Sequence, residues 1–176
     1  MRVSRSVLFA SLIGLLAPIS SLRAETKVEL KGVHLCCPAC TRAVQTTLRD
    51  IEGVKVACDQ KTKTVTITAV DDKAAQNALD ALAAHGFHGD TGSSTLTIKE
   101  DSGVSGGKVS SLTVTGVHNC CGACCAAIKK TVKNVDGVTG DTAKPKATSF
   151  TVTGNFDAAE LVKALNAAGF HVKVQQ

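Results

Sequence analysis

Hydrophobic and polar positions follow one order of patterns along the first half of this chain. Alternation across residues 27–33 predicts a strand, because side chains two residues apart share one face of a sheet. Apolar positions within 43–51 are spaced as on one face of a helix. Two alternating segments, 54–58 and 64–68, predict a hairpin, and a second helix is expected over 71–86, where an aspartate can cap its start.

The second half repeats this order. Residues 112–114 alternate, 127–135 carry a helical stripe, 138–140 form a weaker strand signal, 150–152 alternate, and 157–169 are spaced as a helix. Each half therefore reads strand, helix, strand, strand, helix, strand. This order predicts an α+β fold of two tandem ferredoxin-like (βαββαβ) domains, each a four-stranded antiparallel sheet with two helices on one face.

Domain boundaries follow from the repeat. We expect a first repeat at residues 25–99 and a second at 109–176, joined by a flexible linker at 100–108 that is rich in glycine and serine. Alternation in 95–99 predicts the fourth strand of the first repeat, displaced or bulged relative to the others.

Residues 1–24 have the features of an export signal. Arg2 and Arg5 precede an apolar run of about thirteen residues, short of the roughly 20 needed to span a bilayer, and Ala24 offers a cleavage site. We expect a periplasmic or secreted protein, with an uncleaved membrane anchor as the alternative. Cleavage removes three arginines from a formal net charge of +5, so charge does not favour nucleic acid or an anionic membrane as partner.

Seven of the eight cysteines lie in or directly against two copies of one loop. His34-Leu35-Cys36-Cys37-Pro38-Ala39-Cys40 returns as His118-Asn119-Cys120-Cys121-Gly122-Ala123-Cys124, and Cys125 follows the second copy. A Cys-x-x-Cys pair at the start of a helix places two thiolates where unsatisfied amides and the helix dipole favour anions. Such a pair suits either a soft metal or a disulfide.

A βαββαβ unit with Cys-x-x-Cys between its first strand and first helix resembles the heavy-metal-associated domain. That family includes copper chaperones, the N-terminal domains of metal-pumping P-type ATPases, and periplasmic mercury-binding proteins. The resemblance covers nearly all of the chain after residue 24, in two tandem copies. It implies metal binding by Cys37 with Cys40 and by Cys121 with Cys124. It also implies hand-over to a metal-transporting ATPase or another metal carrier.

The loops depart from the family pattern by an extra thiol. Cys36 and Cys120 stand directly before the pairs, and Leu35 and Asn119 occupy positions where the family usually has methionine. The candidate metal ligands are therefore three thiolates and one imidazole per loop: Cys36, Cys37, Cys40 and His34, and Cys120, Cys121, Cys124 and His118. Cu(I) suits thiolate-rich sites best, and Zn(II) or Hg(II) are the alternatives.

We expect about two metal ions per chain, one in each repeat. The second repeat is expected to bind first, because its loop differs in three ways. Gly122 keeps an amide donor that Pro38 lacks, Cys125 adds a thiol, and Lys129, Lys130 and Lys133 add positive charge to the helix that follows.

These features predict a soft-metal carrier, chaperone or scavenger without enzymatic activity. The alternative is a thiol–disulfide oxidoreductase that uses the Cys-x-x-Cys pairs, although the order of elements is not that of the thioredoxin fold. Cys58 is in phase with Val54 and Val56, and is expected to be a core thiol.

Overall fold

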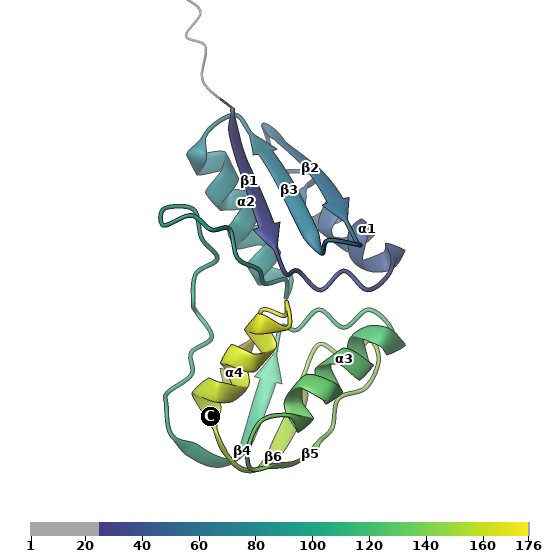
Figure 1. The fold of residues 1–176 in the computed structure, drawn as a ribbon, viewed down its shortest axis with the longest axis vertical. Coiled ribbons are helices and arrows are strands. Elements are labelled where there is room, and N and C mark those ends of the chain that lie inside the picture. The colour runs from purple at the N-terminus through teal and green to yellow at the C-terminus, as the bar shows by residue number, and fades with distance from the viewer. Residues whose placement is uncertain (1–24, 176) are drawn as a thin grey trace, which may run out of the picture.

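The computed structural model describes residues 25–175, which form two antiparallel sheets and four helices (Figure 1). The predicted export signal, residues 1–24, lies outside the described residues, so it stays a prediction. Within the described part of the chain, every helix is too short or too polar to cross a membrane.

The first repeat is built around a three-stranded sheet in the order β1-β3-β2. Both of its helices pack on the face of the sheet that carries Leu30 and Ile67, through Val44 of the first helix and Leu79 of the second. These four side chains are fully or almost fully buried. The elements are β1 (Thr26–Lys31), α1 (Pro38–Leu48), β2 (Val54–Asp59), β3 (Thr64–Ala69) and α2 (Asp72–Ala84).

The predicted fourth strand of the first repeat is absent from its described residues. Thr97, in the middle of that segment, uses both backbone polar groups on the side-chain amide of Gln76 in α2, at 2.8 and 3.3 Å. These groups are therefore not available to the edge of β1. The edge instead pairs with a single residue, because Lys31 and Asp90 exchange two backbone hydrogen bonds of 2.8 and 2.9 Å.

The second repeat has the expected four strands, in the order β5-β6-β4-β7. Its sheet carries two irregularities in register, at Val109/Ser111 and at Val138/Gly140. The elements are β4 (Lys108–Thr115), α3 (Gly122–Lys133), β5 (Val138–Asp141), β6 (Phe150–Asp157), α4 (Ala158–Ala167) and β7 (Lys173–Gln175). The helices pack over one buried cluster that includes Leu112, Val152, Ile128 and Leu161.

An aspartate side chain caps the start of the second helix in each repeat, α2 and α4. Asp71 accepts a hydrogen bond of 2.8 Å from the backbone of Ala74 at the start of α2. Asp157 accepts bonds of 2.9 and 3.1 Å from Ala159 and Glu160 at the start of α4. The aspartate cap expected at the start of α2 is confirmed, and α4 begins with a cap of the same kind.

The two repeats meet through the segments that follow α2 and α4. Phe87 and Phe170 form an antiparallel bridge. Around it, the backbone N–H of His88 donates to Gly169 and that of His171 donates to Gly86, each at 3.1 Å. In Figure 1 the loops that lead into α1 and α3 consequently face each other across the middle of the molecule.

Glycine is required at this contact. Gly86 and Gly169 have φ of +80° and +87°, a region that side chains disfavour. A Cβ on Gly169 would lie 2.4 Å from the backbone nitrogen of His34, and one on Gly86 would lie 2.2 Å from that of His118. Each closing segment therefore packs directly against the cysteine loop of the other repeat.

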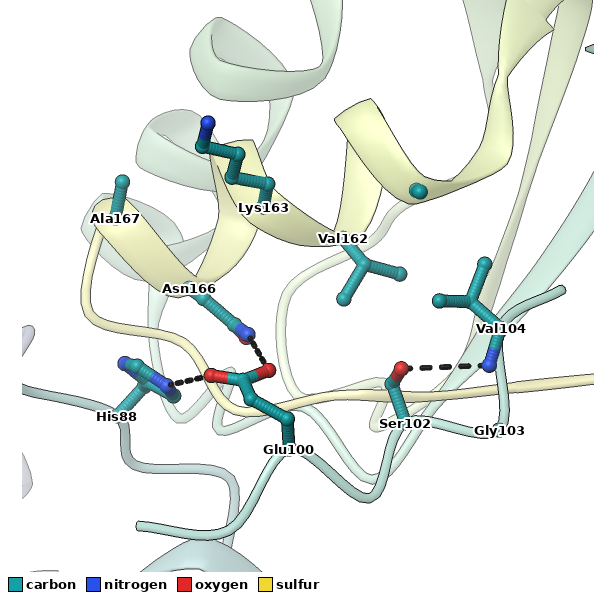
Figure 2. A pocket seen from close by; sticks show the side chains of 10 residues that line it. His88, Glu100, Ser102, Gly103, Val104, Val162, Lys163, Asn166 and Ala167 are labelled. Carbon is teal, nitrogen blue, oxygen red and sulfur yellow. Dashed lines mark hydrogen bonds and ion pairs between the residues drawn. The ribbon is translucent and has the colours of Figure 1, made fainter. Parts of the chain in front are cut away.

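The segment 100–107, inside the predicted linker, is held against the second repeat. Glu100 hydrogen-bonds His88 of the first repeat at 3.2 Å and accepts from Asn166 of α4 at 2.9 Å (Figure 2). Asp101 contacts His171 of the second repeat at 2.7 Å. The segment and α4 line an open pocket of about 600 Å³. The composition indicates a flexible linker, but these contacts fix its first residues in place.

Candidate metal centre

Six cysteine sulfurs from the two loops meet at one place between the repeats. We call them the cysteine cluster: Cys36, Cys37 and Cys40 from the first repeat, and Cys120, Cys121 and Cys124 from the second. All eight cysteines of the chain are free thiols. Each sulfur of the cluster lies within 3.9 Å of at least two others.

The loops form one site rather than two. The sulfur of Cys36 lies 3.4 Å from that of Cys124 in the other repeat, closer than the 3.6 Å to Cys40 in its own loop. Likewise, Cys40 approaches Cys120 to 3.6 Å and Cys124 to 3.7 Å. In this arrangement the two loops offer one joint set of sulfurs, and the expected number of one ion per repeat stays a prediction.

The helix starts position both halves of the cluster. Cys37 is the N-cap of α1 and Cys121 is the N-cap of α3, so both halves of the cluster lie at the amide end of a helix, where α1 lacks its first donor because that position is Pro38. Cys40 and Cys124 follow one turn later and are fully buried, whereas Cys36 is exposed. The cluster therefore has a dry base and an opening to solvent at Cys36.

The sulfur separations fit ions of three or four coordination. With a metal–sulfur bond of about 2.3 Å, the sulfurs around a tetrahedral ion lie about 3.8 Å apart, around a planar three-coordinate ion about 4.0 Å, and across a linear ion about 4.6 Å. Nine sulfur–sulfur pairs in the cluster lie 3.4 to 3.9 Å apart, close to the separations around three- and four-coordinate ions.

The two loop histidines lie beside the cluster and are fixed across the repeat boundary. His34 stacks on Phe170 with ring centroids 4.3 Å apart, and His118 stacks on Phe87 at 4.2 Å. A ring nitrogen of His118 lies within 4.8 Å of the sulfurs of Cys40, Cys120 and Cys124, and one of His34 lies equally near Cys36 and Cys124. Both histidines are therefore placed to join the metal ligands.

Ionisation of the cluster is uneven. A hydrogen bond from Cys124 lowers the pKa of Cys40 to about 2, and the same contact together with burial raises the pKa of Cys124. Cys40 and Cys124 occupy equivalent positions in the two repeats and titrate as a coupled pair. The pair loses one proton readily, and the remaining proton is held between the two sulfurs. Burial raises the pKa of Cys36, and raises that of Cys120 to about 12.

Backbone amides lower the pKa of one partly exposed thiol of the second loop. The N–H of Cys124 lowers the pKa of Cys121 to about 7, helped by the amide of Ala123. At neutral pH the cluster therefore holds thiolates and protonated thiols together, which is the state from which a soft cation displaces the remaining protons.

Two cysteines lie outside the cluster. Cys58 lies on β2, half-buried, and burial raises the pKa of its thiol. Cys125 is buried in the core of the second repeat and belongs to none of the metal-capable groups among the described residues. Cys58 is thus a core-facing thiol as expected, and the extra cysteine of the second loop packs instead of pointing to the cluster.

The lysines of α3 do not lie at the cluster. Lys130 and Lys133 lie in the last turn of this twelve-residue helix, whereas Cys121 lies before its first. At about 1.5 Å per residue the two ends are well over 10 Å apart. Lys129 pairs with Asp141 at 2.7 Å. The charge argument for earlier binding by the second repeat therefore fails.

Asn119 supports the site in a way that its sequence position did not indicate. The residue is buried, and its side-chain amide donates to the carbonyls of Lys144 and Ala147 at 2.7 and 3.0 Å. The backbone carbonyl of Asn119 accepts a hydrogen bond of 2.8 Å from the backbone N–H of Lys146. These bonds tie the second cysteine loop to the segment between β5 and β6. The equivalent Leu35 is buried in the first core.

Comparison with known proteins adds little to this geometry. No family model matches the chain, and no curated protein matches it. A solution structure of the N-terminal soluble domains of CopA from Bacillus subtilis is 18% identical over 88% of this chain and 96% of its own, with a TM-score of 0.32. A structure of the water-soluble region of this P-type ATPase is 19% identical over 88% and 93%, with a TM-score of 0.31. At these scores the likeness decides neither fold nor function.

Proposed function

We propose that this protein is an exported, non-enzymatic soft-metal-binding protein, built from two tandem ferredoxin-like domains, that carries or sequesters Cu(I). The observation that carries the proposal is the cysteine cluster itself. Its six free thiols come from both repeats, and neighbouring sulfurs lie 3.4 to 3.9 Å apart, close enough for several of them to bind the same ion. Thiolate-rich, low-coordinate sites suit Cu(I), which is a soft cation.

Zn(II) is the main competing ion. Cys40, Cys120, Cys124 and His118 form one group of four ligand atoms within 4.8 Å of one another, and Cys₃His is a common zinc ligand set. Hg(II) would share the preference for thiolates. Export rests on residues 1–24 alone, and the resemblance to heavy-metal-associated domains makes a metal-transporting ATPase or another carrier the expected partner.

The test is anaerobic metal binding by the chain from residue 25 with its thiols reduced. Cu(I), Zn(II) and Hg(II) are each titrated against a competing chelator, and bound metal is measured after desalting. We expect Cu(I) to bind more tightly than Zn(II), and a variant with all six cluster cysteines changed to serine to bind neither. A protein that binds no ion but cycles reversibly between thiol and disulfide would support the oxidoreductase alternative.

A further inference from the structure

We propose that the cysteine cluster holds three Cu(I) ions joined by shared thiolates, rather than single ions in separate sites. The inference rests on the proposed function, since it concerns how that same site binds its metal. It follows from how the six sulfurs are arranged, which the two sequence motifs taken separately do not show.

Among the triangles that neighbouring sulfurs form, one set of three uses all six sulfurs. Eight of the nine sides in this set are 3.4 to 3.8 Å long, slightly shorter than the separation of about 4.0 Å around a planar three-coordinate ion. One triangle contains Cys36, Cys121 and Cys124, with sides of 3.7, 3.6 and 3.4 Å. A second contains Cys40, Cys120 and Cys124, with sides of 3.6, 3.7 and 3.7 Å.

The third triangle contains Cys36, Cys37 and Cys40. Cys40 lies 3.6 Å from Cys36 and 3.8 Å from Cys37, and the sulfurs of Cys36 and Cys37 lie within 4.8 Å of each other. Two of the three triangles therefore draw ligands from both repeats.

Any two of these triangles share one sulfur. Cys36, Cys40 and Cys124 each belong to two triangles and would bridge two ions. Cys37, Cys120 and Cys121 each belong to one triangle and would bind one ion. Every ion then has three thiolate ligands, and every sulfur of the cluster is used.

Charge also favours shared ligands. Three Cu(I) ions displace six thiol protons, so the filled cluster carries a net charge of −3. The amide ends of α1 and α3 stabilise this charge. Two unshared ions, in the triangle of Cys36, Cys37 and Cys121 and that of Cys40, Cys120 and Cys124, would leave Cys36 and Cys124 as adjacent thiolates 3.4 Å apart with no cation between them.

The first experiment counts ions in the reduced chain from residue 25 under anaerobic conditions. Cu(I) is added against a competing chelator, the complexes are weighed by native mass spectrometry, and metal–metal scattering is sought by X-ray absorption. We expect three ions per monomer and a short copper–copper distance. One or two ions without that distance would overturn the shared cluster and leave the proposed function intact, whereas no bound copper would overturn the proposed function itself.

The second experiment uses the internal repeat as a matched control. Cys36 and Cys120 are equivalent in sequence, but Cys36 bridges two triangles and Cys120 belongs to one. Cys36→Ser should therefore retain one ion and Cys120→Ser should retain two, while Cys58→Ser, outside the cluster, should retain three. Circular dichroism verifies that each variant is folded. Equal losses in Cys36→Ser and Cys120→Ser would overturn the proposal.

Discussion

At the scale of single residues, the surroundings of each cysteine determine whether it lies in the candidate metal site or packs in a hydrophobic core. Cys40 and Cys124 are buried against other sulfurs, and Cys125, next to one of them in sequence, is buried against apolar side chains of α3 and its core. One residue step on a helix turns the side chain by about 100°, which is enough to separate a ligand from a packing residue. Cys-Cys dipeptides therefore do not reveal which thiol binds metal.

Cys58 provides a test of this division. Cys58→Ala removes a half-buried sulfur that packs against the first core. Because only part of the side chain is buried, we expect the free energy of unfolding to fall by about 1 kcal/mol or less, measured with urea on the reduced protein. Copper capacity should stay the same. A loss of bound metal would show that this thiol reaches the site.

Asn119 should matter for stability more than for metal affinity. Asn119→Ala removes two part-buried hydrogen bonds, to the carbonyls of Lys144 and Ala147, and a typical bond of this kind contributes about 0.5–1.5 kcal/mol to stability. We expect the urea midpoint to fall accordingly while the number of copper ions at saturation stays unchanged. An unchanged midpoint would mean that water replaces the amide.

At the scale of elements, most helices and strands follow from hydrophobic spacing, and the exceptions have physical causes. The start of α2 at Asp72 and the pairing of β2 with β3 agree with their patterns. The alternation at 95–99 did not produce a strand, because Gln76 binds the backbone of Thr97. A local pattern contains no information about a side chain about twenty residues away.

The candidate ligands were recognisable from spacing, but their assembly into one site was not. It depends on the close approach of Gly169 to His34 and of Gly86 to His118, which are contacts between residues far apart in the chain. Glycine after a helix is explained equally well as a C-cap, so its second role cannot be distinguished in the sequence.

The glycine contact leads to a prediction about the repeat interface. Gly169→Ala combines a disfavoured φ of +87° with a Cβ that would lie 2.4 Å from the backbone of His34. We expect the repeats to separate and the copper capacity to fall, although every thiol remains. Copper titration measures the capacity, and small-angle X-ray scattering measures the separation.

Gly92→Ala is the matched control for this substitution. Gly92 has a similar φ of +64°, but a Cβ there would meet nothing within 4 Å. Gly92→Ala should lower the free energy of unfolding only by the backbone strain, about 1–2 kcal/mol, and the variant should retain the full copper capacity. If both variants lose copper to the same extent, strain rather than contact between the repeats is responsible.

At the scale of the whole molecule, half-buried histidines at the repeat boundary couple stability to pH. Burial lowers the pKa of both His34 and His88, and for His88 the carboxylate of Glu100 partly opposes the shift. In the unfolded chain these histidines take up protons near pH 6.5. As pH falls below 6.5, the unfolded state therefore binds more protons than the native state, and the native state loses stability.

We expect the reduced, metal-free protein to unfold at lower urea concentration at pH 5.5 than at pH 7.5. The free energy of unfolding should fall by at most about 1.4 kcal/mol per pH unit for each of the two histidines. His88→Gln should make this dependence shallower, because one of the two groups no longer titrates. A free energy of unfolding that rises as pH falls from 7.5 to 5.5 would contradict the lowered pKa of these two rings.

Each loop histidine stacks on the phenylalanine of the other repeat, and this crossed stacking determines how metal binding depends on protein concentration. One repeat offers both a loop and a phenylalanine at the same end, so two repeats on separate chains would need to meet by diffusion. On one chain, the tether held by Glu100 and Asp101 gives the partner an effective concentration on the order of millimolar. The joint site therefore forms within each molecule, and its affinity for metal is independent of how dilute the protein is.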